Sequence, residues 1–426
     1  MNAPTLILLV TLSADPICMA MEVDDQFNAQ VAGTVHTIAA LPNGQILVGG
    51  EFNGVNGAAR PNLARLDRDG SLDGGFNLSV DGAVFCLASR DDGSFYAGGA
   101  FNSPGRHLFR LLPNGQLDAG LDPGASTGSR IHCLAPAPEG GFFIGGPFLR
   151  FDHGAANYIA KLTATGALDS AFDPGLSQAF ALEAGVGAIA LQPDGKVLLA
   201  GIVGVEDESA CLIRLNPDGS IDQSFSGDHG AMLYPKCIRL LEGGKMLVAG
   251  AGPDGGGFVR RLRPDGSVDP TFAAPEFGDS IETLAIEPDG KILLGGNFEG
   301  KLARLDAAGA LDPMWTIAAN GAVKIIVHES NGNLLIGGAF SHIGGREQRG
   351  IARITNARFQ TFATNENGRF VARLRGEPGR TYQIEFSEDL RGWSDHSTSV
   401  ASESGLEITD PALAHKHRFF RARKVD

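Results

Sequence analysis

The stretches ALQPDGKVLLAG, residues 190–201, and RLNPDGSIDQSF, residues 214–225, decide the fold. Each places a Pro-Asp-Gly turn between two apolar runs. Pro and Asp favour a type I turn, and Gly favours the left-handed position that follows it in a hairpin. The sequence therefore predicts four short antiparallel strands at 189–191, 196–200, 212–215 and 221–222.

The end of this unit is a motif that recurs along the chain: an aliphatic residue, Asp, two variable residues and a large apolar residue. The copies begin 43 to 53 residues apart, at Val23, Leu72, Leu117, Leu168, Ile221, Val268 and Leu311. This period is typical of a four-stranded propeller blade. No long stretch has a convincing helical period. The sequence therefore predicts an all-β, seven-bladed β-propeller over residues 22–355.

The two ends of the repeat region favour a closed ring over an open solenoid. The last unit has the strand IARI, residues 351–354, but lacks the Asp motif that should follow. The first unit has the motif at Val23-Asp24 but no strand before it. We therefore expect the N-terminal strand to complete the last blade, which removes free sheet edges.

A basic residue precedes the motif Asp by eight positions, and the turn geometry places the two residues opposite each other across a hairpin. Cross-strand ion pairs of this kind contribute about 0.2–1 kcal/mol each. The last basic residue should pair with the first Asp across the ring closure. The predicted pairs are Arg65–Asp73, Arg110–Asp118, Lys161–Asp169, Arg214–Asp222, Arg261–Asp269, Arg304–Asp312 and Arg353–Asp24.

The repeats resemble the bacterial delta-60 repeat family in the runs 190–196 and 214–225, and the similarity covers about three quarters of the chain. The second and fifth units depart most from it, and the fifth lacks the Gly-Gly-x-Phe found at 295–298. The resemblance implies a β-propeller in a secreted or surface protein. It implies no catalytic residues.

Residues 356–426 have a different character. Strands are expected at 369–374, 381–386 and 418–423. The run GRTYQIEFSEDLRGW, residues 379–393, resembles a small C-terminal β-sandwich appended to bacterial secreted proteins. That resemblance implies an accessory or anchoring module.

Composition limits the partners and the location. With a net charge of −14 over 426 residues, the chain lacks the basic surface of a nucleic-acid-binding protein. No apolar run has the roughly 20 residues of a membrane-spanning helix. The run LILLVTL, residues 6–12, suits a signal peptide over 1–20, although no basic residue precedes it. Removal of this segment implies a secreted, periplasmic or cell-surface protein. An ordinary N-terminal strand and a cytoplasmic location are the alternative.

Several short motifs fit the repeat better than they fit a catalytic or metal site. GAGPDG at 250–255 spells a dinucleotide fingerprint, and GASTG at 124–128 spells a nucleophile elbow, but neither precedes a helix. Asp67, Asp69 and Asp73 alternate as in a calcium loop, yet the turn and ion-pair pattern explains them. Calcium is the only cofactor that this spacing suggests. The five cysteines do not form a disulfide framework, and Cys86, Cys133 and Cys237 share a repeated small position.

The variable connections between strands share one face of the predicted ring, where recognition is expected. The polar and aromatic residues in them are the candidate binding residues: Phe148, Arg150, Phe151, His153, Tyr158, Glu206, Asp207, Glu208, Tyr234 and His342. We expect a non-enzymatic binding or structural module for a protein or glycan ligand. An exported glycan-active hydrolase or lyase with its site at the mouth of the central channel is the alternative, and an intracellular scaffold is a third. The repeats show no obvious cluster of Asp, Glu, His or Tyr there.

Overall fold

A computed structural model describes residues 21–90, 92–121, 130–151, 154–176, 185–205, 208–227, 234–313, 315–355, 358–364, 370–375, 379–387, 394–402, 406–410 and 419–424. The chain divides into two compact units. The larger unit comprises Val23–Asp312 and Ile317–Arg353, and the smaller one comprises Met1–Glu22, Pro313–Thr316 and Ile354–Asp426. Among the described residues, no helix is long and apolar enough to cross a membrane.

The larger unit is built from antiparallel sheets that follow the repeats of the sequence. The first sheet contains β2 (Val31–Ala40), β3 (Ile46–Val55), β4 (Ala58–Ala59) and β5 (Leu63–Leu66). The second contains β6 (Ala83–Ser89), β7 (Phe95–Ala100) and β8 (Leu108–Leu111). The third contains β9 (Cys133–Pro136), β10 (Phe142–Gly145) and β13 (Ile159–Leu162), beside a hairpin of β11 (Arg150–Phe151) and β12 (Gly154–Ala155).

Four further sheets repeat this plan. The fourth contains β14 (Gly185–Leu191), β15 (Val197–Val205) and β16 (Glu208–Leu215), and the fifth contains β17 (Tyr234–Leu240), β18 (Met246–Ala251) and β19 (Gly257–Leu262). The sixth contains β20 (Ile281–Ile286), β21 (Ile292–Gly296) and β22 (Leu302–Leu305). The last contains β23 (Val323–His328), β24 (Leu334–Gly338) and β27 (Ile351–Thr355), beside a hairpin of β25 (His342–Ile343) and β26 (Arg346–Glu347).

In six of these sheets, the aliphatic residue before the motif Asp forms one β-bridge to the outer strand, as between Ile221 and Leu215. The expected all-β class is confirmed, since the described helical structure is one 3₁₀ turn, η1 (Glu242–Gly244).

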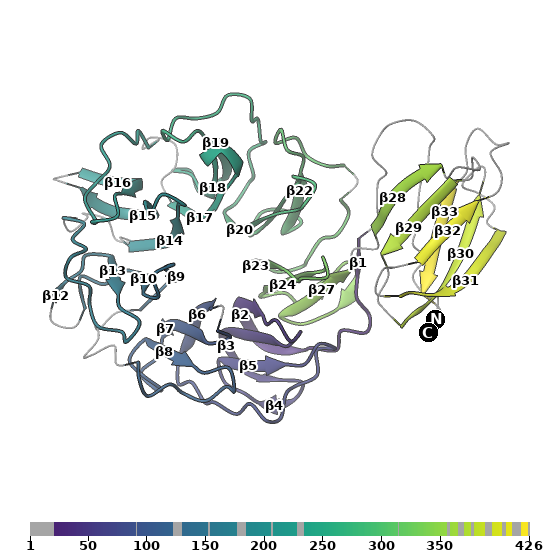
Figure 1. Ribbon diagram of the computed structural model, residues 1–426, viewed down its shortest axis with the longest axis horizontal. Helices are drawn as coiled ribbons and strands as arrows, with labels where there is room; N and C mark the ends of the chain where they lie inside the picture. The colour runs from purple at the N-terminus through teal and green to yellow at the C-terminus, as the bar shows by residue number, and fades with distance from the viewer. Residues whose placement is uncertain are drawn as a thin grey trace. The chain divides into compact units, whose positions relative to one another are not determined.

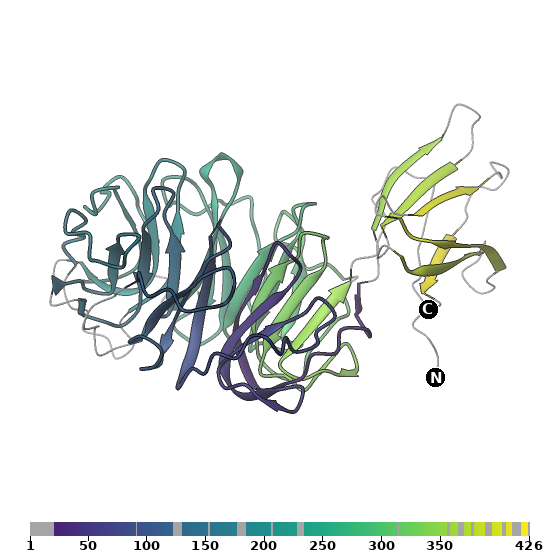
Figure 2. The same cartoon turned by 60° about the horizontal axis from the view of Figure 1, so that its bottom comes forward.

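The first strands of the sheets follow one another around a central opening (Figure 1). Here they are called the inner strands: β2, β6, β9, β14, β17, β20 and β23. Each inner strand packs beside the inner strand of the next sheet, and β23 packs beside β2. In the turned view, the strands run roughly along the axis of this opening (Figure 2).

The N-terminal strand β1 (Glu22–Val23) belongs to the last sheet, whose strand order is β1-β27-β24-β23. The backbone N–H of Asp24 donates to the carbonyl of Arg353 at 2.8 Å. Residues from the two ends of the repeat region also share one apolar cluster, in which Phe27 and Val31 are buried with Leu335 and Ile351.

The apolar cores lie between neighbouring sheets. Between the fourth and fifth sheets, Leu198 and Leu212 pack with Met246 and Val248, and the large apolar residue of the motif, Phe225, joins them. The repeated aliphatic strands are buried because each sheet is covered on both faces by its neighbours.

The smaller unit contains two three-stranded sheets. One has the order β28 (Arg358–Thr364), β29 (Phe370–Arg375), β32 (Leu406–Asp410). The other has the order β31 (Ser394–Val400), β30 (Thr381–Ser387), β33 (Phe419–Lys424). The predicted strands of this region fall within one residue of β29, β30 and β33.

Candidate functional site

A glycine that recurs in, or directly after, the second strand of the seven sheets shapes the inner strands. A Cβ atom built on this glycine would lie 2.0–2.4 Å from a carbonyl oxygen in the inner strand or up to three residues before it, closer than atoms can approach. The seven positions are Gly50, Gly99, Gly146, Gly201, Gly250, Gly296 and Gly338. Only glycine lets the two strands meet so closely, and the inner strand forms a β-bulge at this point.

The bulge inserts one extra residue into the inner strand, as at Lys236, where the pairing shifts between Pro235 and Cys237. The pairing shifts around one residue in five other inner strands as well, so each of these strands has an extra residue at the same point. In the third sheet, His132 occupies the corresponding position just before β9. The seven positions are here called the channel ring: His36, Phe85, His132, Gly187, Lys236, Glu282 and Lys324. Because the inner strands surround the opening, these bulges place their side chains at the channel.

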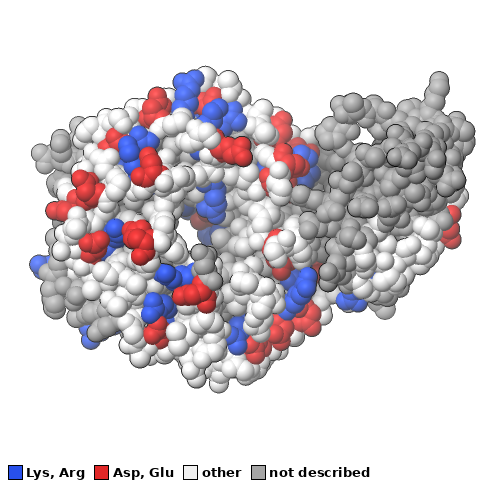
Figure 3. Space-filling model, viewed as in Figure 1, with Lys and Arg blue, Asp and Glu red and all other residues white. Residues whose placement is uncertain are grey.

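One arc of the channel ring is charged. The Lys236 Nζ lies 2.6 Å from Glu282 Oε1, and the Lys324 Nζ lies 3.4 Å from Glu282 Oε2. Glu282 Oε1 also accepts hydrogen bonds from Ser280 Oγ at 2.9 Å and Asn297 Nδ2 at 3.0 Å. These groups lie near the starts of β17, β20 and β23, which is the channel end that faces the variable connections. Figure 3 shows charged side chains around and inside the opening.

The opposite arc is aromatic. The rings of His36 and Phe85 meet edge to face with centroids 5.3 Å apart, and Phe85 meets His132 in the same way at 5.5 Å. Between this arc and Lys236, the ring position is Gly187, where a Cβ atom would meet the carbonyl oxygens of Ala200 and Pro235 at 3.8 and 3.9 Å.

The electrostatics keep the imidazoles neutral and the carboxylate charged. Burial opposes ionisation of Glu282, but the charges of Lys236 and Lys324 outweigh it and hold its pKa below the usual value. Burial and the nearby Lys324 lower the pKa of His36. Burial and Arg130 lower the pKa of His132 to about 4. At neutral pH the ring therefore holds two ammonium groups, one carboxylate and two uncharged imidazoles.

Three of the aromatic residues predicted to serve in binding are core residues instead. Phe148 and Phe151 are 1% exposed and pack in the cluster between the second and third sheets. Tyr158, 2% exposed, packs in the next cluster. The prediction was wrong because the connection after β10 folds back as the β11–β12 hairpin and turns its aromatic side chains inward.

The remaining candidates are dispersed. Arg150 and His342 are exposed, and His342 Nδ1 lies 3.1 Å from Ser341 Oγ. Tyr234 is half-buried, two residues before Lys236 at the start of β17. His153, Glu206 and Asp207 lie outside the described residues, and of Glu208 only the backbone, at the start of β16, is described.

The basic residue and the motif Asp of each repeat lie next to each other. The N–O distances are 2.7 Å for Arg65–Asp73, 3.4 Å for Lys161–Asp169, 2.8 Å for Arg214–Asp222, and 2.9 Å for both Arg261–Asp269 and Arg304–Asp312, with Arg110 and Asp118 also in contact. A lysine directly before the second strand also pairs with the motif Asp in three of these repeats, for example Lys196 with Asp222 at 2.6 Å.

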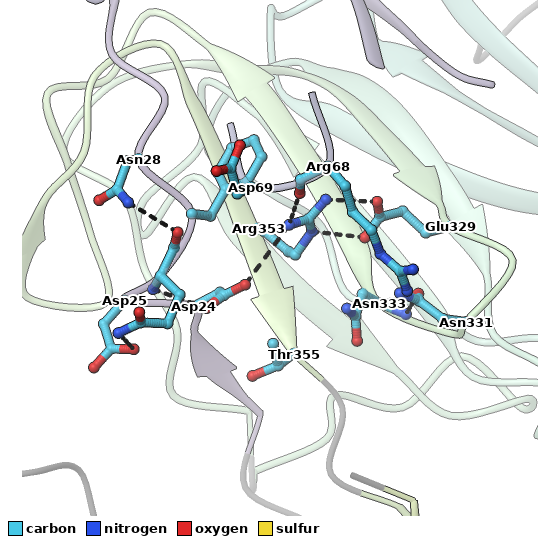
Figure 4. Close-up of polar contacts among 12 residues, drawn as sticks. Asp24, Asp25, Asn28, Arg68, Asp69, Glu329, Asn331, Asn333, Arg353 and Thr355 are labelled. Carbon is cyan, nitrogen blue, oxygen red and sulfur yellow. Dashed lines mark hydrogen bonds and ion pairs between the residues drawn. The ribbon is translucent and has the colours of Figure 1, made fainter. Parts of the chain in front are cut away.

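Arg353 differs from the expected pattern in its principal partner (Figure 4). Its guanidinium donates to both carboxylate oxygens of Glu329, at 2.7 and 2.8 Å, whereas Asp24 lies 3.7 Å away. A further hydrogen bond reaches the carbonyl of Arg68 in the first sheet at 2.6 Å, and the guanidinium lies 4.4 Å from the centre of the Phe27 ring. Arg353 thus joins the last sheet to the first through several contacts rather than one ion pair.

The carboxylates suggested for calcium have donors from the protein. Asp67 accepts from Gln45, Asp69 accepts from Ser71 in its own turn, and Asp73 pairs with Arg65. Within the described part of the chain, no group of three His, Cys, Asp or Glu side chains is placed to hold a metal ion.

The channel ring could have been found from a position of the repeat that mostly holds a small residue, because each ring residue comes directly before it. Examples of this small position are Thr37, Cys86, Cys133, Cys237 and Thr283. Cys86, Cys133 and Cys237 are free thiols, as predicted, and burial raises their pKa.

Comparison with known proteins bears on the fold alone. A family model described as a domain of unknown function (DUF5122) beta-propeller matches residues 41–76, 90–120, 192–225, 244–272, 287–313 and 329–356. These repeated matches support a β-propeller family. The comparison with curated proteins finds no match.

Among solved structures, a streptogramin B lyase is similar with a TM-score of 0.53 and 12% identity, over 79% of this chain and 98% of that one. YCF48 bound to D1 peptide has a TM-score of 0.45 and 12% identity, over 79% and 99%. Virginiamycin B lyase from Staphylococcus aureus has a TM-score of 0.42 and 13% identity, over 80% and 94%. At such identities the first likeness bears on the propeller fold alone, and the other two carry no argument.

Proposed function

We propose that the larger unit is a seven-bladed propeller closed by its N-terminal strand, and that it acts as a binding module. The seven sheets, the succession of inner strands and the pairing of β1 with β27 support the ring. Closure of the ring brings the channel-ring residues of all seven repeats to one channel, so the site depends on the architecture.

The ligand binds at the channel end where the variable connections meet. The observation that carries this proposal is the convergence of Lys236, Glu282 and Lys324 from three inner strands, with Ser280 and Asn297 behind the carboxylate. Concave sites with a few convergent polar groups among apolar walls are typical of ligand sites.

The same geometry favours binding over glycan hydrolysis. Glycoside hydrolases use two carboxyl groups, and the one that acts as an acid needs a raised pKa. The pKa of Glu282 is lowered, and its Oε1 is engaged by three donors. A carboxylate in this state serves as a fixed structural anion.

We further propose that the protein is exported and that residues 356–426 form a β-sandwich with an accessory or anchoring role. The apolar run at 6–12 and the resemblance to delta-60 repeat proteins support export, and the two sheets of the smaller unit support the sandwich. N-terminal sequencing of the native protein tests export. A mature chain that begins near residue 21 is expected, and a retained N-terminus would contradict it.

Thermal unfolding tests the binding function. A collection of small carboxylates, phosphates, amines and oligosaccharides is added to the wild type and to the Lys236→Ala/Lys324→Ala variant. At least one class should raise the unfolding temperature of the wild type only. Equal stabilisation of both proteins would place the ligand elsewhere, and no stabilisation by any class would contradict a binding site. Turnover of any compound would show that the protein is an enzyme rather than a binding module.

A further inference from the structure

We propose that the channel takes a small organic anion, with a carboxylate or phosphate group held by Lys324 and Arg239 and a flat apolar body against His36, Phe85 and His132. This inference rests on the proposed binding function and names the chemistry of the ligand. It follows from the charge of the inner strands, the unequal pairing of the two lysines and the aromatic arc.

The channel lining is basic in an acidic protein. The inner strands carry three residues with full positive charge, Lys236, Arg239 and Lys324, and one with negative charge, Glu282. The whole chain carries −14. A local excess of one sign in a walled channel concentrates ligands of the other sign and speeds their entry.

The two lysines are not equally neutralised. Lys236 makes a short contact of 2.6 Å with Glu282, and two neutral donors fill the rest of the coordination of the same oxygen. Lys324 lies 3.4 Å from the other oxygen, and its side chain is 25% exposed. An ammonium group has three donors. One carboxylate cannot neutralise two ammonium groups, so the charge of Lys324 remains for a ligand.

Arg239 is a second cation on the inner strands. It follows the ring residue of β17 by three positions, and the same position on the other inner strands holds Ala39, Ala88, Ala135, Ala190, Ala285 and Val327. Arg239 is exposed although it lies on an inner strand, and its Nη1 donates to the carbonyl of Ile238 at 2.9 Å. Arg239 is thus the one large basic side chain at a position that holds Ala or Val on the other inner strands.

The other wall of the channel suits an apolar ligand body. His36, Phe85 and His132 form a row of rings in edge-to-face contact. Both imidazoles are neutral at pH 7, so they do not compete for the anion. The next ring position, Gly187, adds no side chain beside this row. A planar ring in the ligand could stack there while its anionic group reaches the lysine side.

Benzoate, phenyl phosphate and the neutral isostere benzamide test the inference, with binding followed by saturation-transfer NMR at millimolar concentration. Benzoate or phenyl phosphate should bind at least about tenfold more tightly than benzamide, and the stronger of the two identifies the anionic group. Lys324→Gln and Arg239→Gln should each weaken anion binding about tenfold or more. Arg263→Gln removes the same charge from an exposed turn outside the inner strands and should leave binding unchanged.

Equal binding of benzamide and the anions would overturn the inference, and so would failure of both anions to bind. An unchanged affinity in Lys324→Gln and Arg239→Gln would overturn it as well, because the anion would then bind elsewhere. If a neutral oligosaccharide protects the wild type but not the double lysine variant, the binding function stands and the anionic ligand is rejected. Protection by no compound at all rejects both. Circular dichroism of each variant confirms that it folds.

Discussion

Replacement of Arg353 by Met should destabilise the larger unit far more than loss of a surface ion pair. The side chains of Arg353 and Glu329 are 6% and 9% exposed, and Asp24 is equally buried. The substitution leaves two buried carboxylates without their guanidinium. Removal of one partner from a buried ion pair costs about 3–5 kcal/mol. The free energy of unfolding, from urea titration followed by circular dichroism, should fall by that amount.

Arg349→Met is the matched control, because Arg349 pairs with Glu347 at 2.9 Å with both side chains about 60% exposed. Its loss should cost less than about 1 kcal/mol. If the unpaired Glu329 is the cause, the double variant Arg353→Met/Glu329→Met should be more stable than Arg353→Met alone. A cost for Arg353→Met no larger than that of the control would show that the contacts of Arg353 are worth no more than a surface ion pair. A double variant that recovers nothing would show that the unpaired Glu329 is not the cause.

Three further predictions concern the bulge, the channel histidine and the core. Gly296→Ala places a Cβ 2.3 Å from a backbone oxygen of the inner strand and should cost about 1–3 kcal/mol, whereas Gly278→Ala, with open space around it, should be neutral; urea unfolding compares them. His132 stays neutral in the folded chain down to about pH 4 but gains a proton near pH 6.5 when unfolded, so it contributes stability above pH 6.5 that is lost as the pH falls toward 4. Between pH 7 and 5 the wild type should therefore lose about 2 kcal/mol more than His132→Gln, and parallel pH profiles would disprove the shift. Phe148→Ala removes a core side chain and should lower the free energy of unfolding by about 3–5 kcal/mol. Arg150→Ala, at an exposed position, should lower it by less than about 0.5 kcal/mol. Equal unfolding midpoints for the two variants would contradict the burial of Phe148.

The repeat spacing predicted much of the architecture because it reports local hairpins. A Pro-Asp-Gly turn fixes which residues lie opposite each other, so Arg214 and Asp222 could be paired from the sequence alone. Long-range partners are not fixed by a local turn. Glu329, the principal partner of Arg353, lies in another connection of the same sheet, and nothing in the eight-residue spacing points to it.

The channel ring is hard to predict from the sequence because of the bulges in the inner strands. Simple alternation along an inner strand predicts two faces, and an extra residue shifts that alternation at the point where Lys236 enters the channel. The close approach that causes the shift depends on a glycine in the next strand, such as Gly250, so neither strand reveals it alone. Phe148 and Tyr158 were predicted to serve in binding because they lie in a long connection between strands. Such a connection can fold back and turn its side chains into the core, as it does here.

Closure of the ring is tested most directly by the pKa of His36, measured by NMR in the wild type and in Lys324→Gln, with His36→Gln to assign the signal. His36 belongs to the first repeat and Lys324 to the last. Burial lowers the pKa of His36, and the charge of Lys324 lowers it further. We expect the pKa of His36 to rise toward 6.5 when Lys324 loses its charge. An unchanged pKa would mean that the two ends of the repeat array do not meet across one channel.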